Sequence, residues 1–130
     1  MPTNGVYKLL IIDDNIPVIR IIQQSLARRP QFAILTSYDA EGGLVLVESE
    51  KPDLILLDIN LPRMNGFQAC KLIKKINPVL PVIIITGELG AERRLKAYEA
   101  GADDFLEKPF SMDQLVSHIR YYLHLSSLDH

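Results

Sequence analysis

Short apolar runs in this sequence lead directly into side chains that can do chemistry. One run ends in the paired carboxylates Asp13 and Asp14, a second in Asp58, a third in the hydroxyl of Thr86, and a fourth leads to the ammonium of Lys108. Runs this short and this rich in Ile, Leu and Val predict strands that are buried on both faces of a parallel sheet. Because such sheets bind ligands beyond the carboxyl ends of their strands, we expect these side chains to meet in one crevice.

The three carboxylates predict a site for a divalent cation. Ionised carboxylates that lie close together raise one another's pKa, and a bound cation relieves their repulsion. Oxygen ligands select hard cations, and a site with few carboxylates and open water positions favours Mg²⁺. The sequence has no Cys/His cluster that would compete for zinc. An acidic pair alone could merely cap the next helix. Asp58 at the end of a second strand favours the metal site, with Asp13 and Asp14 as ligands.

The same side chains suit the transfer of a phosphoryl group to a carboxylate. That reaction needs a carboxylate nucleophile, a cation to neutralise the transferring oxygens, and donors to position them. Asp58 is the candidate nucleophile because it ends the central strand, and Lys108 and Thr86 are the candidate donors. Pro109 restrains the backbone that presents Lys108. Phe105, on the preceding strand, is most simply an aromatic residue packed against helices.

Five strand-like runs alternate with five helix-like segments. Strands are expected at Lys8–Asp13, Phe32–Ser37, Leu54–Asp58, Val82–Thr86 and Asp104–Glu107. Helices are expected at Ile16–Arg29, from Asp39 to about Glu50, at Gly66–Ile76, at about Ala91–Ala100, and from Ser111 to Leu123. Gly42 and Gly43 weaken the second helix and indicate close packing or mobility there. The alternation predicts an α/β fold with right-handed crossovers and helices on both faces of the sheet, but it leaves the strand order open.

Composition predicts one ordinary globular domain. The 130 residues are 48% hydrophobic and 23% charged with a formal net charge of −2, so we expect no nucleic-acid binding by this domain. No apolar stretch approaches membrane-spanning length, the amino terminus lacks a signal pattern, and the single cysteine, Cys70, excludes an intrachain disulfide. A reduced, cytoplasmic location without a membrane partner is therefore expected. We expect a tail at residues 1–7, the domain at 8–124, and at 125–130 a tail or the start of a truncated linker.

Five motifs in order resemble the receiver domain of bacterial two-component response regulators. They are Ile12-Asp13-Asp14-Asn15, Pro52-Asp53-Leu54-Ile55-Leu56-Leu57-Asp58, Leu61-Pro62-Arg63-Met64-Asn65-Gly66, Ile84-Ile85-Thr86-Gly87, and Gly101-Ala102-Asp103-Asp104-Phe105-Leu106-Glu107-Lys108-Pro109-Phe110. Each motif alone is weak, but together they cover about residues 8 to 124, and their order argues against a chance match. Two positions depart from that family. Asn65 stands where Asp is frequent, and Gly43 stands where Ala is commoner.

The resemblance implies a flavodoxin-like, doubly wound (βα)5 parallel sheet with strand order 2-1-3-4-5. It implies that Asp58 accepts a phosphoryl group from a histidine kinase or a histidine phosphotransfer protein. The ligands that it assigns to Mg²⁺ are Asp13, Asp14, Asp58 and the backbone carbonyl of Asn60. It makes Thr86 and Phe105 the switch pair, and it implies a cis peptide before Pro109. Such a chain is not an enzyme for an external substrate, but a phosphoacceptor that assists its own phosphorylation and dephosphorylation.

Three other interpretations compete with this one. A degenerate receiver would only bind a partner, but the complete set of carboxylates, threonine and lysine argues against that. A metal-dependent phosphatase acting through an aspartyl intermediate typically has a second Asp two residues beyond the nucleophile, and this sequence has Asn60 there. A flavin or nucleotide binder would need a phosphate loop rich in Gly, Ser or Thr after the first strand. That position here holds Asp-Asp-Asn-Ile-Pro, which is anionic.

The signal is expected to leave through the helix near 91–100, the strand Asp104–Glu107 and the last helix. The Gly87–Gly90 connection lowers the cost of rearrangement, and the helix after it is polar, with only Leu95, Ala97 and Tyr98 to anchor it. This surface would control an output domain or partner, or form a phosphorylation-dependent homodimer. The simpler alternative is an ordinary solvated helix. Asn60 and Glu88, two residues beyond Asp58 and Thr86, are expected to orient an attacking water and set the lifetime of the phosphorylated state.

Overall fold

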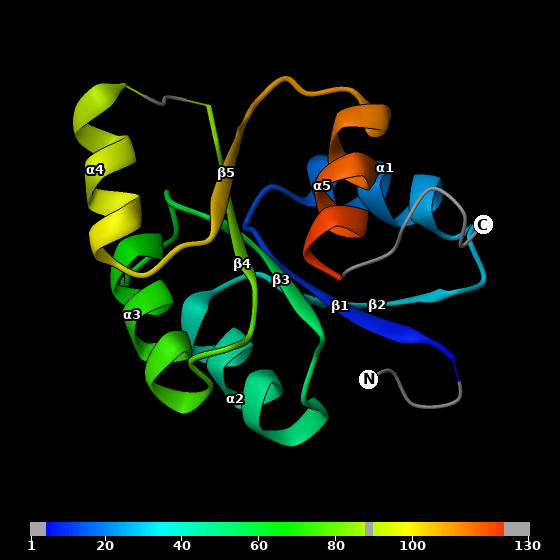
Figure 1. The fold of residues 1–130 in the computed structure, drawn as a ribbon, viewed down its shortest axis with the longest axis horizontal. Coiled ribbons are helices and arrows are strands. Elements are labelled where there is room, and N and C mark those ends of the chain that lie inside the picture. Colours follow the sequence, from blue (N-terminus) through cyan, green and yellow to red (C-terminus); the bar gives the residue numbers. More distant parts are fainter. Residues whose placement is uncertain (1–4, 88–89, 124–130) are drawn as a thin grey trace.

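The computed structural model describes residues 5–87 and 90–123, in which five strands and five helices alternate along the chain (Figure 1). In chain order they are β1 (Tyr7–Ile12), α1 (Ile16–Leu26), β2 (Phe32–Ser37), α2 (Ala40–Glu50), β3 (Leu54–Asp58), α3 (Gly66–Ile76), β4 (Val82–Thr86), α4 (Ala91–Glu99), β5 (Asp104–Glu107) and α5 (Met112–Tyr122). Four strands and α3 have the bounds that the sequence predicts. Short apolar runs define β3 and β4 sharply, and Asn65 and Asn77-Pro78 bound α3.

The sheet is parallel and has the order β2-β1-β3-β4-β5, which confirms the flavodoxin-like, doubly wound α/β fold (Figure 1). In the register, Ile12 pairs with Leu57, Asp58 with Ile85, and Thr86 with Glu107. The carboxyl ends of four neighbouring strands therefore meet at one edge of the sheet. The strand order reverses between β1 and β3, and in open α/β sheets such a reversal leaves a crevice for ligands.

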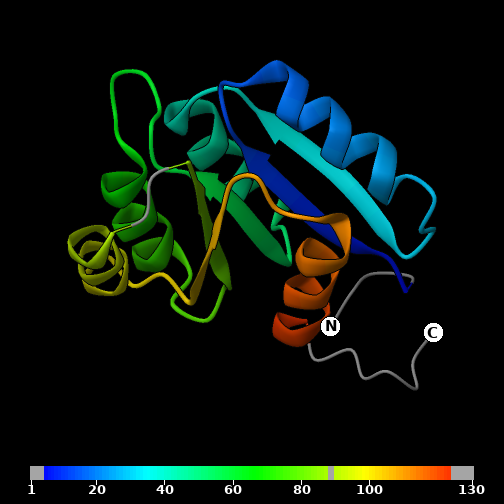
Figure 2. The same cartoon turned by 90° about the horizontal axis from the view of Figure 1, so that it is seen from above.

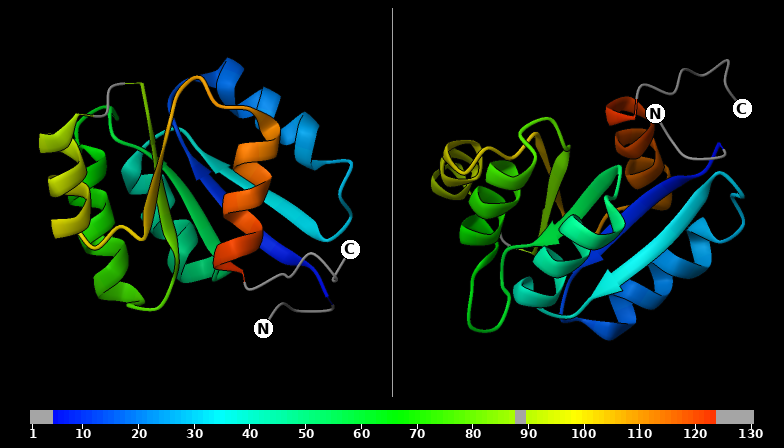
Figure 3. Two further views of the ribbon diagram at one scale, coloured as in Figure 1. Left: turned by 45° about the horizontal axis from the view of Figure 1, so that its top comes forward. Right: turned by 90° about the horizontal axis from the view of Figure 1, so that it is seen from below.

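Alternate strand residues point to opposite faces and build two separate cores. Leu10 and Ile12 pack with residues of α2, α3 and α4, whereas Leu9 and Ile11 pack with residues of α1 and α5. Figure 1 shows this division, and both views of Figure 3 show α3 and α4 side by side along the β4 and β5 edge. All four of these strand residues are fully buried. Each such side chain contributes about 1.5–3 kcal/mol to folding, so the sheet is a rigid platform for the loops at its edge.

Three predicted bounds, in the first strand and the first helix, are wrong by one to three residues. Strand β1 spans Tyr7–Ile12 rather than Lys8–Asp13, because Tyr7 already pairs with Phe32 and Asp13 has left the ladder with β3. Tyr7 therefore belongs to the sheet and not to a tail. Helix α1 ends at Leu26 rather than Arg29. The chain tightens there into a turn in which the Arg29 N–H donates to the Leu26 carbonyl, and Pro30 follows.

Side-chain caps and one close approach fix α2 and α3. Asp39 accepts the Gly42 N–H at the start of α2, and Asn65 forms a full capping box with Gln68 at the start of α3. A Cβ on Gly43 would collide with the Ile12 side chain, whose Cγ1 would lie 2.8 Å away. Close packing, rather than mobility, therefore explains the glycine. It lets α2 press against the strand that ends at the crevice.

The expected tail at 125–130 and the expected residue Glu88 lie outside the described residues. Within the described part of the chain, no helix combines the length and the apolar character that a membrane span requires. The Lys108–Pro109 peptide bond is cis, as the resemblance implied.

Candidate functional site

The three predicted carboxylates meet at the carboxyl ends of β1 and β3. Each of Asp13, Asp14 and Asp58 offers an oxygen, and these oxygens all lie within 4.8 Å of one another. Asp13 is fully buried and Asp58 is 5% exposed, whereas Asp14 faces solvent. Asp13 stays in line with the sheet because its N–H donates to the Ser37 carbonyl at 3.0 Å. The sheet thus brings together residues that are 45 positions apart in the sequence.

Lys108 supplies a positive charge to this cluster. Its Nζ lies 3.0 Å from Asp13 Oδ2 and 3.9 Å from Asp58 Oδ2, and its backbone N–H donates to the Thr86 carbonyl at 2.7 Å. The cis bond to Pro109 follows directly. We call Asp13, Asp14, Asp58 and Lys108 the acidic crevice. It contains three carboxylates and a single ammonium.

Burial and crowding perturb Asp58 strongly. Desolvation, followed by repulsion from Asp13, raises the pKa of Asp58 from 3.8 to about 6, although Lys108 and the Asn60 N–H act in the opposite direction. That N–H lies 3.4 Å from Asp58 Oδ1. A carboxylate with this pKa is still mostly ionised at pH 7. It is poorly solvated, which makes a cation beside it favourable.

The donor set fits Mg²⁺. The clustered carboxylate oxygens are hard ligands, the solvent-facing Asp14 leaves room for water, and the charge of one lysine leaves the cluster anionic. Asn60, whose backbone carbonyl is the fourth predicted ligand, is the second residue after β3, which ends at Asp58. Gly66 lets α3 begin close to this point, since a Cβ there would collide with the Asp58 backbone oxygen and lie 2.6 Å from Ile59 Cα.

The two predicted switch residues lie on neighbouring strands. Thr86 is fully buried at the end of β4, next to the strand that ends in Asp58. Phe105, half-buried on β5, pairs with Ile84, two residues before Thr86. Its ring meets Tyr98 edge-to-face, with centroids 5.4 Å apart, and the Arg94 guanidinium lies 4.6 Å from the ring centroid. Two residues of α4 therefore hold this ring.

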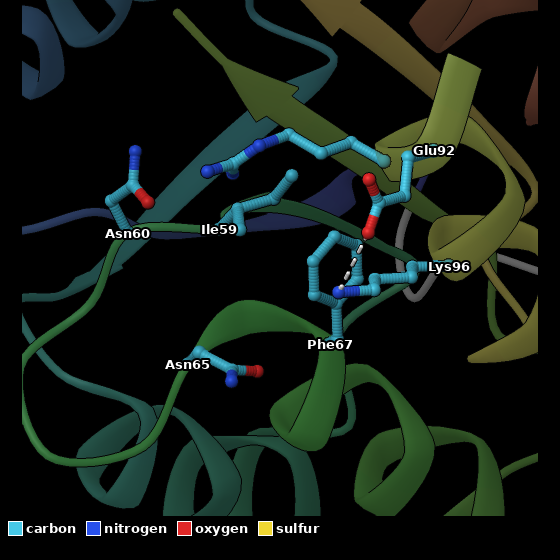
Figure 4. A pocket seen from close by; sticks show the side chains of 7 residues that line it. Ile59, Asn60, Asn65, Phe67, Glu92 and Lys96 are labelled. Atoms are coloured by element: carbon cyan, nitrogen blue, oxygen red, sulfur yellow. Dashed lines mark ion pairs between the residues drawn. The ribbon is translucent and has the colours of Figure 1, made fainter. Parts of the chain in front are cut away.

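A polar pocket of about 370 Å³ lies beside the crevice, between the loop after β3 and α4 (Figure 4). Its lining residues are Ile59, Asn60, Asn65, Phe67, Glu92, Arg93 and Lys96. Figure 4 shows Glu92 and Lys96 directed toward each other along one side of α4, and their charged atoms are 3.7 Å apart. The sequence predicts a role for Asn60 at the crevice but not this pocket, which depends on the packing of α4 against α3.

An apolar groove on the other side of Lys108 was also missed. It has a volume of about 380 Å³ and is lined by Val18, Ile21, Ile22, Lys108, Pro109, Phe110 and Met112. One feature of the sequence could have indicated this groove. Ile21 and Ile22 are adjacent on a helix, so only one of them can face the core, and Ile21 is 57% exposed. The groove joins the crevice at Lys108.

Comparison with known proteins places this geometry in a family. The chain matches the response regulator receiver domain family over residues 9–120. It is 31% identical over 121 residues to the alkaline phosphatase synthesis transcriptional regulatory protein PhoP of Bacillus subtilis, covering 93% of this chain and 50% of that protein. It is 30% identical over 125 residues to the response regulator MprA of Mycolicibacterium vanbaalenii, covering 94% of this chain and 52% of that protein. This chain thus spans about half the length of these curated relatives.

Solved structures of response regulators have the same fold. The CheY-like response regulator receiver domain protein of Methanospirillum hungatei superposes with a TM-score of 0.87 at 28% identity, covering 92% of this chain and 94% of that one. A two-component response regulator of Clostridium difficile superposes with a TM-score of 0.86 at 28% identity, covering 91% and 96%. Both similarities extend over nearly the whole chain.

Proposed function

This chain belongs to the response regulator receiver domain family of two-component signalling, and we propose that it is a switch operated by phosphorylation of Asp58. The proposed phosphodonor is a histidine kinase or a histidine phosphotransfer protein, and the reaction depends on Mg²⁺. The observation that carries this proposal is the acidic crevice itself. A buried, poorly solvated carboxylate ends the central strand beside two further carboxylates and one ammonium. We also propose a cytoplasmic location, which the single, buried and free Cys70 supports.

The residues of the crevice would act as nucleophile, metal ligands and hydrogen-bond donors in phosphoryl transfer. A carboxylate oxygen of Asp58 forms a bond to phosphorus while the N–P bond of the phosphohistidine breaks, and the departing imidazole nitrogen keeps that electron pair and takes up a proton. Asp13, Asp14, Asp58 and the Asn60 carbonyl would hold the metal. Bound Mg²⁺ neutralises charge on the transferring oxygens. Lys108, already directed at Asp58, and the hydroxyl of Thr86 then donate to the acylphosphate oxygens. We also propose that the chain is a phosphoacceptor that assists its own phosphorylation and dephosphorylation rather than an enzyme for an external substrate, because Asn60 stands where the related phosphatases typically have a second Asp.

The apolar groove supports a docking place for the phosphodonor. Lys108 lines both the groove and the crevice, so a protein seated against Ile21 and Phe110 brings a phosphohistidine next to Asp58. Apolar patches that adjoin a reactive site are typical of protein interaction surfaces. The groove carries little charge apart from Lys108, so the proposed contact is mainly apolar.

The output surface is proposed to be α4, β5 and α5. Helix α4 buries only Ala97 in the core and begins without a side-chain cap, while Leu95, Tyr98 and Tyr121 are exposed on this surface. A weakly anchored helix is a natural two-state element for a local charge change to bias. Phosphorylation draws Thr86 inward, and the Phe105 ring turns into the space that this opens. The surface would then bind an output domain, a partner or a second copy of the chain.

A phosphorylation assay tests the site. Incubation with Mg²⁺ and acetyl phosphate should give an acid-stable, base-labile adduct on Asp58, and Asp58→Asn should take up none. Asp53→Asn is the matched control, because Asp53 lies at the opposite end of β3, where its carboxylate accepts the Lys8 N–H at 2.8 Å. Full labelling of Asp58→Asn would refute the assignment.

Hydrogen exchange tests the output surface. With beryllofluoride as a phosphoryl mimic, amides of α4, β5 and α5 should change protection, whereas those of α2 should not. Thr86→Ala should still be phosphorylated but should transmit poorly. Changes confined to the loops around Asp58 would place the output elsewhere.

A further inference from the structure

The loop between β3 and α3 carries one side of the crevice. It spans residues 59–65 and projects beyond the sheet edge as the green loop of Figure 2. Ile59 anchors its start in the core, and Leu61 and Met64 pack against that core. Further along, its backbone–backbone hydrogen bonds are local, such as Met64 N–H to the Pro62 carbonyl at 2.7 Å and Gly66 N–H to the Ile59 carbonyl at 2.8 Å. Asn60, the predicted metal ligand, is the second residue of this loop, so the position of its carbonyl depends on how the loop is held.

Asn60 and Asn65 make polar contacts with the flanking elements β3 and α3, and Arg63 makes those that join this loop to α2. Its Nη2 lies 2.9 Å from Asp39 Oδ2, and its Nε lies 3.4 Å from Glu41 Oε2. Its backbone is left-handed, with φ of +66°, which is uncommon for a residue with a Cβ. The residue that contacts the start of α2, Arg63, thus has a strained backbone conformation.

The acceptor of this contact is itself fixed to the other side of the crevice. Asp39 Oδ1 accepts the Gly42 N–H at 2.7 Å, so one carboxylate caps α2 and holds Arg63 together. Ser37 Oγ donates to the Asp39 carbonyl at 2.8 Å, and the Ser37 carbonyl accepts the N–H of Asp13. A continuous chain of hydrogen bonds therefore runs from Arg63 to Asp13.

We propose that Arg63 is a positioning residue for the metal and phosphoryl site. By tying the loop after β3 to the first turn of α2, it sets how far the Asn60 carbonyl stands from Asp13. This inference rests on the proposed function, because it assumes that the crevice binds Mg²⁺. The positioning acts before any phosphoryl group arrives, so Mg²⁺ affinity of the unphosphorylated chain reports it directly.

The sign of the effect separates positioning from simple charge. Removing a positive charge near an anionic site strengthens cation binding by long-range attraction. Loss of positioning weakens it, because the ligands must be ordered when the cation binds. A weaker affinity in a variant that has lost a positive charge therefore cannot come from net charge.

The experiment compares Arg63→Gly with Lys51→Gly. Lys51 is also left-handed, with φ of +48°, and it lies at the opposite end of α2, so both variants lose one charge and one left-handed side chain. Titration calorimetry with MgCl₂ should show two- to fivefold weaker binding for Arg63→Gly, the range that an exposed ion pair supports, and no weakening for Lys51→Gly. Affinity in Arg63→Gly equal to or tighter than that of the unmodified chain overturns the proposal.

Reciprocal variants test whether the ion pairs carry the effect. Glu41→Gln and Asp39→Asn should each weaken Mg²⁺ binding, the latter while keeping an oxygen that can cap α2, but loss of a nearby negative charge has this effect on its own. The discriminating comparison is therefore each of these changes alone against the same change combined with Arg63→Gly, or with Arg63→Gln if Arg63→Gly folds poorly. Arg63→Lys should be intermediate, because one ammonium cannot reproduce the forked contact. Effects of Arg63→Gly and Glu41→Gln that add fully would overturn the ion-pair basis. Failure of the unmodified chain to bind Mg²⁺ would instead refute the proposed function.

Discussion

Charged side chains gather at both ends of the sheet, but the two groups differ in how their charges are balanced. At the carboxyl ends, the acidic crevice sets three carboxylates against the ammonium of Lys108. At the amino ends of β4 and β5, Lys74 and Asp103 form a one-to-one pair with Nζ 2.6 Å from Oδ2, which we call the brace. The two groups differ in depth as well as in charge, since Asp13 is fully buried and Asp58 is 5% exposed, whereas the side chains of Lys74 and Asp103 are 16% and 34% exposed.

Neighbouring backbone groups complete the brace. Asp103 Oδ2 also accepts the Val82 N–H at 2.9 Å, and Lys74 Nζ also donates to the Leu80 carbonyl at 2.7 Å. The pair thereby joins α3 to the starts of β4 and β5. The ammonium of Lys74 balances the carboxylate of Asp103, and backbone groups complete their hydrogen bonds, so the pair has no excess charge that would attract a ligand.

The crevice, in contrast, remains short of positive charge. Burial, followed by repulsion from Asp13, raises the pKa of Asp58 to about 6, so the folded chain holds this carboxylate in an unfavourable environment. A carboxylate that stays ionised in such an environment lowers the free energy of unfolding unless a ligand compensates it. The comparison therefore indicates that the brace serves stability, whereas the crevice gives up stability, as the proposed binding of a cation and a phosphoryl group would require.

The largest expected difference between the two groups is in Mg²⁺ affinity. Asp13→Asn and Asp14→Asn each remove a charged ligand and should weaken binding about tenfold or more, because carboxylate charge dominates affinity for a hard cation. Asp103→Asn, which removes the same charge from the brace, should leave the affinity within about twofold, since the two ends of the sheet are screened from each other by salt. Titration calorimetry on the unphosphorylated chain measures both. Unchanged affinity in both crevice variants would remove them from the metal site.

Opposite effects on stability should follow from the same substitutions without metal. Asp58→Asn removes the poorly solvated charge and should raise the free energy of unfolding by roughly 1–3 kcal/mol at pH 7, the upper figure being the pKa change from 3.8 to about 6 converted at about 1.4 kcal/mol per unit. Asp103→Asn leaves Lys74 without a counter-charge and should lower it by roughly 1–2 kcal/mol, between the values for exposed and buried pairs. Urea unfolding in the presence of a chelator tests both. The same sign in the two variants would contradict the comparison.

Much of the fold and of the crevice follows from sequence because both depend on local patterns. The strands Leu54–Asp58 and Val82–Thr86 are apolar up to their last residue and buried throughout, so burial fixes their ends, and with them the positions of Asp58 and Thr86. Parallel strands then bring these ends together without any further information. The strand order is different. It came from the resemblance, since alternation of strands and helices allows several orders.

The features that the sequence did not predict depend on contacts between distant side chains. Arg63 meets Asp39 across 24 positions, and Lys74 meets Asp103 across 29. Neither partner is marked by type or spacing, because charged residues on helices and loops are usually solvated. The groove beside Lys108 needs the packing of α1 against the segment after β5, which only the assembled fold provides.

The pH dependence of the free energy of unfolding should show the perturbed titration of Asp58 in the crevice. The folded-state pKa of Asp58 lies above its ordinary value, so the folded chain binds the proton more tightly, and this contribution to stability is complete below about pH 4 and lost as pH rises through about 6. Between pH 5 and 7 the metal-free chain should lose about 1 kcal/mol from this group. Subtracting the profile of Asp58→Asn isolates it from other titrating groups.

Saturating Mg²⁺ provides the control for that profile. Cation binding requires ionised carboxylates. The free energy of unfolding of the unmodified chain minus that of Asp58→Asn should therefore rise with pH in saturating Mg²⁺, whereas it falls with pH without metal. A difference profile that is flat from pH 4 to 7 without metal would show that Asp58 is not perturbed.

The smallest expected effect concerns Tyr122, which lies beside the brace on α5. Its hydroxyl is 3.0 Å from both the Asp103 carbonyl and Asp104 Oδ2, and burial together with the Asp104 carboxylate raises the pKa of Tyr122. One hydroxyl proton cannot donate fully to two acceptors, and both acceptors remain accessible to water, so Tyr122→Phe should lower the free energy of unfolding by about 1 kcal/mol or less.

Mg²⁺ affinity and acetyl phosphate labelling should not change in Tyr122→Phe, because no charge is altered and the crevice lies at the other end of β5. Urea unfolding and Mg²⁺ titration on the same preparation would decide. A several-fold loss of Mg²⁺ affinity would mean that the two ends of the sheet are mechanically coupled, and the separation of a stabilising end from a functional end would then have to be abandoned.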